Sequence, residues 1–412
     1  MVIVEFFDKV SLENICGALL CRPERVVFVG PNRKRMERGI ALYQRLLISK
    51  GISTELSCIS APRNNLHSIV DRLSEIVEQY GGDCVFDLTG GDDLYLVAVG
   101  IIMERYKEKV KCHRFNFLND QLCDCDADGE ILEVAGFDIS IEDNITIYGG
   151  NIITDPNSEC YTYKWDFSGD FLSDIEAMWS ICRQNPRLWN TQMNCFGAIC
   201  NAFEMDSPLE ISFDQKEAEL SLYGSNNKYV CIIWMLRELQ KKGLINSLYV
   251  DDTVYFKFKN EQVKRCLTVA GQILELFVAA RLRAIKDESG LPLYNDVKVG
   301  TVISWNPSED GFECSTINEV DVIAMRGAVP VFISCKNGYF DANELYKLNT
   351  VAQRFGNKYA KKVLIATEMD KLGDKAEYLN SRMDDMDITC IDNVDVMSDS
   401  ELERILTSLW KN

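Results

Sequence analysis

Residues 319–338 read EVDVIAMRGAVPVFISCKNG, which predicts a β-hairpin of two apolar runs around the turn signal RGAVP. Asp321 interrupts the first run, and Lys336 ends the second. Successive side chains of a strand point to opposite faces, so Glu319 and Asp321 share one face of their strand. Ser334 and Lys336 share a face of the next strand in the same way. Pairing through the turn is therefore expected to bring Asp321 near Lys336.

This charged pair has two interpretations, because a lone carboxylate or ammonium in a core is costly without a partner, an ion or water. The first is a purely structural ion pair. The second is a functional site, to which Glu275 adds a second carboxylate from the apolar helix that we predict before the hairpin. Two carboxylates and a strand-end carbonyl are hard oxygen ligands suited to Mg²⁺ or Mn²⁺, and such an ion activates water and neutralises phosphate charge. Lys336 would orient the water or stabilise the transition state.

The order of a glutamate on a helix, an aspartate on a strand and a lysine at the end of the next strand resembles the PD-(D/E)XK nuclease core. The resemblance covers residues 266–368. It implies a restriction-endonuclease-like α/β domain and a metal-dependent endonuclease. It also implies that Glu275, Asp321 and Lys336 are the catalytic residues and that the first two bind the metal.

The chain departs from this family at Ser334, which replaces the second strand acid two residues before the lysine. We expect Glu319 to compensate for the missing acid and the main-chain carbonyl of Cys335 to remain a metal ligand. The departure leaves the number of metal ions open. A catalytically inactive nuclease domain is the alternative.

The first 150 residues alternate strands with helices, which predicts a mainly parallel sheet covered by helices. The expected strands are residues 25–30, 52–60, 83–91 and 111–117, and the expected helices are residues 33–51, 64–82 and 92–109. Residues 124–150 read as shorter strands and turns that end this domain.

The stretch DLTGGDDLYLVAVG at residues 87–100 places a glycine pair where a buried strand ends and a helix begins. In an open parallel sheet this edge binds ligands, and its free N–H groups suit phosphate. A tight turn without a ligand is the alternative.

A Rossmann-like domain with this strand-TGG-helix motif upstream of a nuclease resembles the CARF sensor domains of type III CRISPR ancillary proteins. Such a domain implies binding of a cyclic oligoadenylate. Candidate ligand contacts from three loops are Ser11, Asn14, Pro31, Asn32, Arg33, Thr89, Gly90, Gly91 and Asp92. The common family form has Thr-Lys after the glycines, whereas this chain has Asp92 and Asp93 and so lacks one expected phosphate contact.

Residues 151–262 are expected to form a connector, and residues 263–412 the nuclease domain. Within the connector, a helix that ends near Gly243 and two strand-like runs around Asp251 and Asp252 resemble a winged-helix unit. Because no basic recognition helix is evident, a spacer is favoured over a DNA-binding role. The last segment reads as one long helix at residues 263–287, three strands, a helix, a strand and a tail with a short helix.

The 412 residues carry a net charge of −19, which argues against a nucleic-acid partner at first sight. Residues 326–362, however, hold seven basic residues against two acidic ones, and such an island attracts phosphate. Lys347, Arg354, Lys358 and Lys361 are therefore candidate contacts to a substrate backbone, unless the island is an ordinary solvated helix face.

The residue counts also limit the chemistry and the compartment. Only two histidines occur and they are far apart in the sequence, which argues against a histidine-rich metal site. Sixteen cysteines, many within apolar runs, indicate reduced thiols in a cytoplasmic protein. No apolar stretch reaches transmembrane length, so no membrane association is expected.

Together these features predict a homodimer that binds a cyclic oligoadenylate, with the cyclic tetra-adenylate as the expected ring. Two-fold symmetry suits a ring-shaped ligand because it presents the same loops twice. The activated protein would cleave or nick DNA, with single-stranded RNA as a further substrate, using Mg²⁺ or Mn²⁺. A ligand-responsive DNA-binding regulator and a protein that only sequesters or degrades the ligand are the alternatives.

Overall fold

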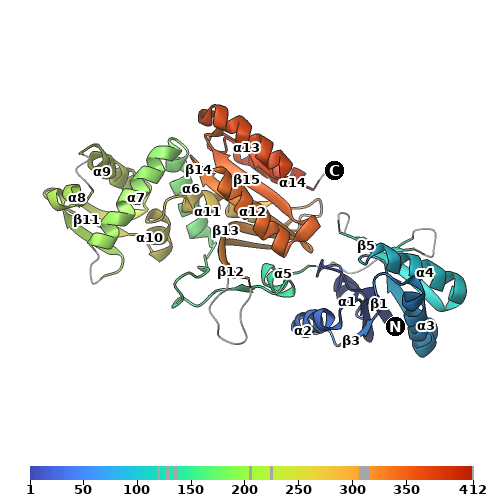
Figure 1. Ribbon diagram of the computed structural model, residues 1–412. Coiled ribbons are helices and arrows are strands. Elements are labelled where there is room, and N and C mark those ends of the chain that lie inside the picture. The colour runs from blue at the N-terminus through green and yellow to red at the C-terminus, as the bar shows by residue number, and fades with distance from the viewer. Residues whose placement is uncertain are drawn as a thin grey trace.

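The structure is a computed structural model that describes residues 1–117, 121–125, 130–132, 138–203, 207–222, 226–305 and 316–410. We call the three parts predicted above the N-terminal domain, the connector and the C-terminal domain. Figure 1 shows the C-terminal domain (mostly yellow to red) between the N-terminal domain (blue to cyan) and the connector (green to yellow). The part of the chain described here holds no helix that is both long and apolar enough to cross a membrane.

The N-terminal domain is built on a seven-stranded sheet with the order β3-β2-β1-β4-β5-β6-β7. Its strands are β1 (Val2–Phe6), β2 (Arg25–Gly30), β3 (Glu55–Ser60), β4 (Cys84–Asp87), β5 (Val110–Asn116), β6 (Gln121–Asp124) and β7 (Ile131–Leu132). The first five pair in parallel, and β6 and β7 are added antiparallel. Its helices are α1 (Cys16–Cys21), α2 (Arg33–Ser49), α3 (Leu66–Tyr80) and α4 (Asp93–Tyr106). The predicted Rossmann-like alternation of strands and helices is confirmed.

The connector pairs helices with a three-stranded antiparallel sheet of order β10-β11-β9. Its elements are α6 (Gly169–Cys182), α7 (Pro186–Ala202), β9 (Glu210–Asp214), α8 (Gln215–Ser221), α9 (Asn226–Lys241), β10 (Ile245–Val250), β11 (Thr253–Phe258) and α10 (Glu261–Leu267). The helix that ends before Gly243 and the hairpin that follows it match the predicted winged-helix-like unit.

The C-terminal domain is built on a six-stranded sheet with the order β16-β15-β14-β13-β12-β8. Its strands are β8 (Asn151–Ile152), β12 (Asp296–Ser304), β13 (Ile317–Arg326), β14 (Val329–Asn337), β15 (Lys361–Thr367) and β16 (Thr389–Ile391). Its helices are α11 (Gln272–Ala284), α12 (Ala342–Phe355), α13 (Asp374–Asp385) and α14 (Asp399–Ser408). Helix α5 (Ile141–Ile147) leads the chain from the N-terminal domain into β8, which pairs with β12. The predicted domain boundaries at 150 and 262 stay predictions.

The predicted hairpin is present as β13 and β14, which pair antiparallel from Arg326 with Val329 to Val322 with Ile333. Helix α11 packs on the face that buries Val322 and Ile333. Helix α12 packs on the opposite face, where Phe332 is buried. The α/β fold class with its three parts is confirmed.

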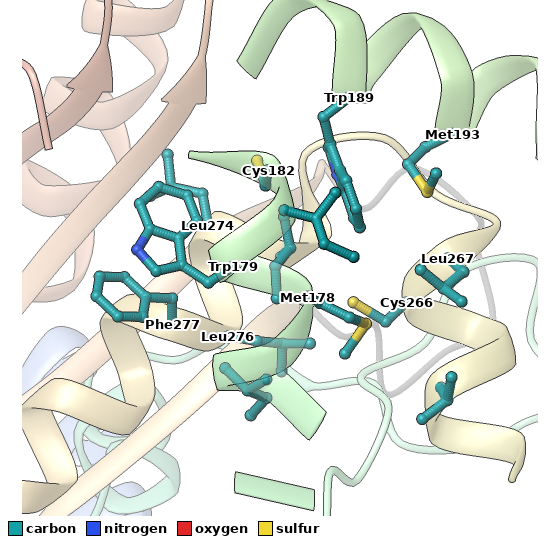
Figure 2. Packing of buried hydrophobic residues seen from close by; sticks show 14 of the residues in the cluster. Met178, Trp179, Cys182, Trp189, Met193, Cys266, Leu267, Leu274, Leu276 and Phe277 are labelled. Atoms are coloured by element: carbon teal, nitrogen blue, oxygen red, sulfur yellow. The ribbon is translucent and has the colours of Figure 1, made fainter. Parts of the chain in front are cut away.

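A hydrophobic core joins the connector to the C-terminal domain and fixes helix α11. In it the Trp179 ring of α6 stacks on the Phe277 ring of α11, with ring centroids 4.6 Å apart (Figure 2). The same core contains side chains of α6, α7, α10 and α11: Met178, Cys182, Trp189, Met193, Cys266, Leu267, Leu274 and Leu276. Leu274 and Leu276 are fully buried on either side of Glu275, so the core sets the position of that carboxylate.

The single helix predicted at residues 263–287 is wrong, because two helices occupy this stretch. Helix α10 ends at Leu267, and α11 begins at Gln272 after Gly271. Gly271 has a φ of +91°, a backbone conformation that residues with a side chain rarely adopt. Glu275 therefore lies in the first turn of a short helix rather than in the middle of a long one.

Candidate active site

The candidate active site is centred on Asp321 of β13 and Lys336 of β14. The last paired residue of β13 is Val322, which directly follows Asp321 in the chain. Next to this last pair, the Asp321 side chain takes the place of the main-chain ladder as a hydrogen-bond acceptor. Its Oδ2 atom accepts hydrogen bonds from Cys335 N at 2.7 Å, Ser334 Oγ at 3.1 Å and Lys336 Nζ at 3.2 Å. The predicted proximity of Asp321 and Lys336 is confirmed.

Lys336 has a second carboxylate partner that the sequence did not reveal. Glu344, in the first turn of α12, lies 3.0 Å from Lys336 Nζ and 2.7 Å from Lys347 Nζ. Burial alone lowers the pKa of Lys336, but the charges of Asp321 and Glu344 outweigh it and raise that pKa above its ordinary value. Lys336 is therefore a charged ammonium at neutral pH, suited to stabilise anionic charge but not to accept a proton.

Glu275 approaches this pair from helix α11. Burial raises the pKa of Glu275 well above its ordinary value, and the negative charges of Asp321 and Glu319 raise it further. The positive charge of Lys336 lowers the pKa of Glu275 and so partly offsets these effects. The Glu275 Oε2 atom accepts a hydrogen bond from Gln272 Nε2 at 2.8 Å. The expected approach of Glu275 to the hairpin is thus present, and its neighbours crowd negative charge around it.

Glu319 lies at the margin of the site, where the pKa of its carboxyl is raised by burial and by Asp321. A Cβ atom added to Gly300 of β12 would lie 3.3 Å from Glu319 Oε1, so the glycine leaves room for this carboxylate. The charge of Arg265 lowers the pKa of Glu319, and the Arg265 guanidinium lies over the Tyr163 ring, 4.3 Å from its centroid. Arg265 is thus a cation near the site that the sequence patterns did not indicate.

The donor set fits a divalent ion only in part. Among the described residues, no group of three or more histidine, cysteine, aspartate or glutamate side chains is arranged to hold a metal. A metal here would therefore rely on Glu275, Asp321 and the Cys335 carbonyl, completed by water or substrate oxygens, as Mg²⁺ sites commonly are. The crowded negative charge around Glu275 is the observation that favours a cation, because a cation would relieve it. The metal and catalytic roles of these residues, and that of Glu319, stay predictions.

The predicted ligand contacts gather at one edge of the N-terminal sheet. The three loops follow β1, β2 and β4, which are adjacent and parallel, so their carboxyl ends meet. Gly91 has a φ of +110°, and a Cβ atom there would lie 2.7 Å from Phe6 Cβ. The glycine is therefore required for this loop to close over β1.

Two of the predicted ligand contacts are buried and engaged in the loops themselves. The Asn14 side chain accepts from Asp8 N at 2.7 Å and donates to Tyr43 OH at 2.9 Å. The Thr89 hydroxyl accepts from Phe115 N at 2.8 Å. Both side chains shape the pocket edge, and their predicted contact with a ligand would need rearrangement.

The other predicted contacts are more accessible. Asn32 caps α2 by accepting from Arg35 N at 3.1 Å, and Arg33 pairs with Glu37. Asp92 lies 2.9 Å from the Arg63 guanidinium, which comes from the loop after β3. Arg63 thus supplies a cation close to the loop in which the family lysine is missing, and the sequence motif alone did not indicate it. Pro31 is exposed, and Ser11 is half-buried.

Glu13 connects this loop cluster to the C-terminal domain. A Cβ atom on Gly90 would lie 3.3 Å from Glu13 Oε2, so Glu13 packs against the glycine loop. Its Oε1 atom lies 2.7 Å from Lys358 Nζ and accepts a hydrogen bond from Tyr359 OH. The Glu13 side chain is 2% exposed, so a buried carboxylate spans the contact between the two domains.

The four cations proposed as backbone contacts do not converge. Lys347 is tied to the active site through Glu344. Lys358 faces Glu13 of the N-terminal domain. Lys361 lies over the ring of Trp410 in the C-terminal tail, and Arg354 lies over the ring of Phe355. Of the four, the structure brings only Lys347 to the candidate site.

Comparison with known proteins identifies the fold. No protein-family model and no curated protein sequence matches the chain. Two solved structures match it along nearly their whole length. Protein VC1899 from Vibrio cholerae has a TM-score of 0.72 and 18% identity, covering 100% of this chain and 98% of its own. Can2 from Sulfobacillus thermosulfidooxidans, solved in complex with cyclic tetra-adenylate, has a TM-score of 0.66 and 17% identity, covering 100% and 97%. The whole three-part architecture is therefore shared with these proteins.

Proposed function

We propose that this protein is a metal-dependent endonuclease of type III CRISPR defence, activated by a cyclic oligoadenylate. The observation that carries the proposal is the Asp321–Lys336 pair at the end of the β13–β14 ladder, with Glu275 beside it. The shared fold with Can2, whose structure holds cyclic tetra-adenylate, supports that ring as the activator. The gathering of the β1, β2 and β4 loops supports the pocket for it.

In this proposal each residue of the site has a defined task. Glu275, Asp321 and the Cys335 carbonyl would hold Mg²⁺ or Mn²⁺, and the ion when bound supplies Lewis acidity and an activated water. Lys336, held charged between Asp321 and Glu344, stabilises the negative charge that develops on the phosphate. DNA or RNA would be the substrate, cut in a homodimer in which each N-terminal domain supplies half of the ligand pocket.

The decisive experiment incubates a labelled single strand with Mn²⁺, with and without cyclic tetra-adenylate, using the wild type and Lys336→Ala. We expect ligand-dependent cleavage that falls by about 100-fold or more in the variant, because a preorganised charge at the reacting phosphate is lost. If cleavage is the same with and without the ligand, the N-terminal domain does not control the nuclease. Sequence-specific duplex binding that survives in Lys336→Ala would favour a regulator. No cleavage under any metal would leave only a ligand-binding protein.

Glu13 provides a second test, directed at coupling between the two sites. Glu13→Gln keeps the shape of the side chain but removes the charge that attracts Lys358. We expect the affinity for cyclic tetra-adenylate, measured by calorimetry, to stay within a few-fold. We also expect ligand-stimulated cleavage to fall by about 5- to 10-fold, the scale of a coupling of 1–1.4 kcal/mol. Arg72→Gln, which removes an exposed charge of the N-terminal domain that pairs with Glu75 within α3, is the control for coupling. If the ligand stimulates cleavage by Glu13→Gln as strongly as by the wild type, the Glu13–Lys358 contact does not couple the ligand pocket to the active site.

A further inference from the structure

A basic cleft begins one residue after Lys336 and lies between the connector and the C-terminal domain. It has a volume of about 490 Å³. Its walls are Arg187 and Asn190 of α7, residues 337–339 at and just after the end of β14, and residues 371, 372 and 375 around the start of α13. From this cleft we infer that the protein binds the backbone of a single-stranded polynucleotide on one side of the cleaved bond. This inference rests on the proposed function and adds the surface that positions the substrate.

The charge of the cleft matches a phosphate backbone. Its described lining residues include three cations, Arg187, Lys371 and Lys375, and no carboxylate, in a chain of net charge −19. Glu368 lies beneath the surface with 6% of its side chain exposed. It is 2.8 Å from Arg187 Nε and also pairs with Lys371. Even with Glu368 counted, the cleft keeps an excess of positive charge, and the buried acid fixes two of its cations in place.

Tyr339 gives the cleft an aromatic surface. Tyr339 is 64% exposed, so its ring is open to solvent. Lys375 Nζ lies 5.0 Å from the centroid of the ring and 3.3 Å from its hydroxyl. An exposed ring beside cations is the combination by which proteins hold single strands, because bases stack on the ring while the cations follow the phosphates.

The floor of the cleft is fixed to the active site. The Asn337 side chain donates to Asn190 Oδ1 at 2.8 Å and accepts from Thr367 Oγ1 at 3.0 Å. Asn337 follows Lys336 in β14, and three residues of extended chain span about 10 Å. Tyr339 is thus within about that distance of Lys336, and a strand that reaches both would contact the connector and the C-terminal domain together.

Binding is tested in the full-length Asp321→Asn protein with Mg²⁺ and cyclic tetra-adenylate, using a fluorescent DNA 12-mer and its RNA counterpart. We expect Tyr339→Ala to weaken binding by about 5- to 100-fold and Tyr339→Phe to bind nearly as the parent does, because stacking needs only the ring. Lys371→Gln with Lys375→Gln should lower the slope of log Kd against log salt by about 1.4, or 0.7 per lost charge. Neither change leaves Glu368 without Arg187, and melting temperatures verify folding.

The matched control removes two exposed lysines of the connector far from the cleft, Lys216→Gln and Lys242→Gln, and should leave the salt slope within error. If the variants lose affinity equally for DNA and RNA, the cleft contacts features that both share, the phosphates and the base rings. If affinity falls for one of the two alone, that nucleic acid is the substrate. Should the Tyr339 and double-lysine variants bind as the parent does while the wild type still cleaves, this inference is overturned and the proposed function stands. If the wild type cleaves no strand, the proposed function itself has failed.

Discussion

Replacing Asp321 by asparagine is expected to lower the rate of strand cleavage by about 100-fold or more while leaving the fold intact. The amide has the size of the carboxylate and keeps one oxygen for Cys335 N, which is the shortest of its three hydrogen bonds. It loses the charge that a metal requires and half of the negative charge around Lys336. Removing one preorganised electrostatic contact at a reacting group typically lowers the rate by about 100-fold or more. Asp321 is proposed to make two such contacts, one to the metal ion and one to Lys336.

The measurement is a single-turnover cleavage rate in Mn²⁺ with saturating cyclic tetra-adenylate. Asp252→Asn, in the exposed β10–β11 turn, is the matched control and should cleave as the wild type does. Ligand affinity should be the same in all three proteins, because Asp321 lies in the C-terminal domain. A rate within tenfold of the wild type in Asp321→Asn would support the structural interpretation of the Asp321–Lys336 pair.

Much of the fold could be read from local pattern. The hairpin of β13 and β14 was predictable because both its turn and its alternation lie within twenty residues. Strand β1 was not assigned, although all five of its residues are buried at the centre of the N-terminal sheet. Its Glu5 interrupts the apolar run, and only the tertiary structure shows that Asp87 of the neighbouring strand accompanies it. The break at Gly271 was missed because glycine is tolerated within helices unless its φ is positive.

The candidate site was predictable where its residues share one hairpin and not where they meet through packing. Asp321 and Lys336 follow from strand register. Glu344 approaches Lys336 from α12, and no spacing in the sequence indicates that contact. The basic island was visible as composition, but the docking of the N-terminal domain determines that Lys358 pairs with Glu13. Cations from α7 and α13 form the cleft beside the site, and they lie almost two hundred residues apart in the chain.

Replacing Glu275 by glutamine is expected to abolish cleavage and, at the same time, to stabilise the metal-free protein at alkaline pH. The pKa of Glu275 is higher in the folded protein than in the unfolded chain, so folding takes up a proton between these two values. The stability that this provides is complete below the unfolded pKa of about 4.3 and is lost as the pH rises through the folded pKa. Above the unfolded pKa the unfolded chain releases this proton, whereas burial beside Asp321 and Glu319 opposes its release from the folded protein, so the fold is less stable at pH 8 than at pH 4.

Glutamine at position 275 removes this cost and can still accept the hydrogen bond from Gln272. We expect the melting temperature at pH 8 with chelator to rise by about 2–4 °C, the shift that about 1 kcal/mol gives a domain of this size. The gain should shrink as the pH approaches 5, because the Glu275 carboxyl of the unfolded chain then becomes protonated as well and folding takes up less of a proton. Glu288→Gln, at an exposed position, should show no such gain at either pH.

Adding Mn²⁺ should reverse the order of the two proteins. A cation that binds the folded state stabilises it by mass action, and in the wild type it also neutralises the charge crowded at Glu275. The melting temperature of the wild type at pH 8 should therefore rise with Mn²⁺, and that of Glu275→Gln should rise much less. If both proteins respond equally, Glu275 is not a metal ligand. If the variant is less stable than the wild type with chelator at pH 8, the Glu275 carboxylate already has a stabilising partner in the folded protein and is not held for a metal ion.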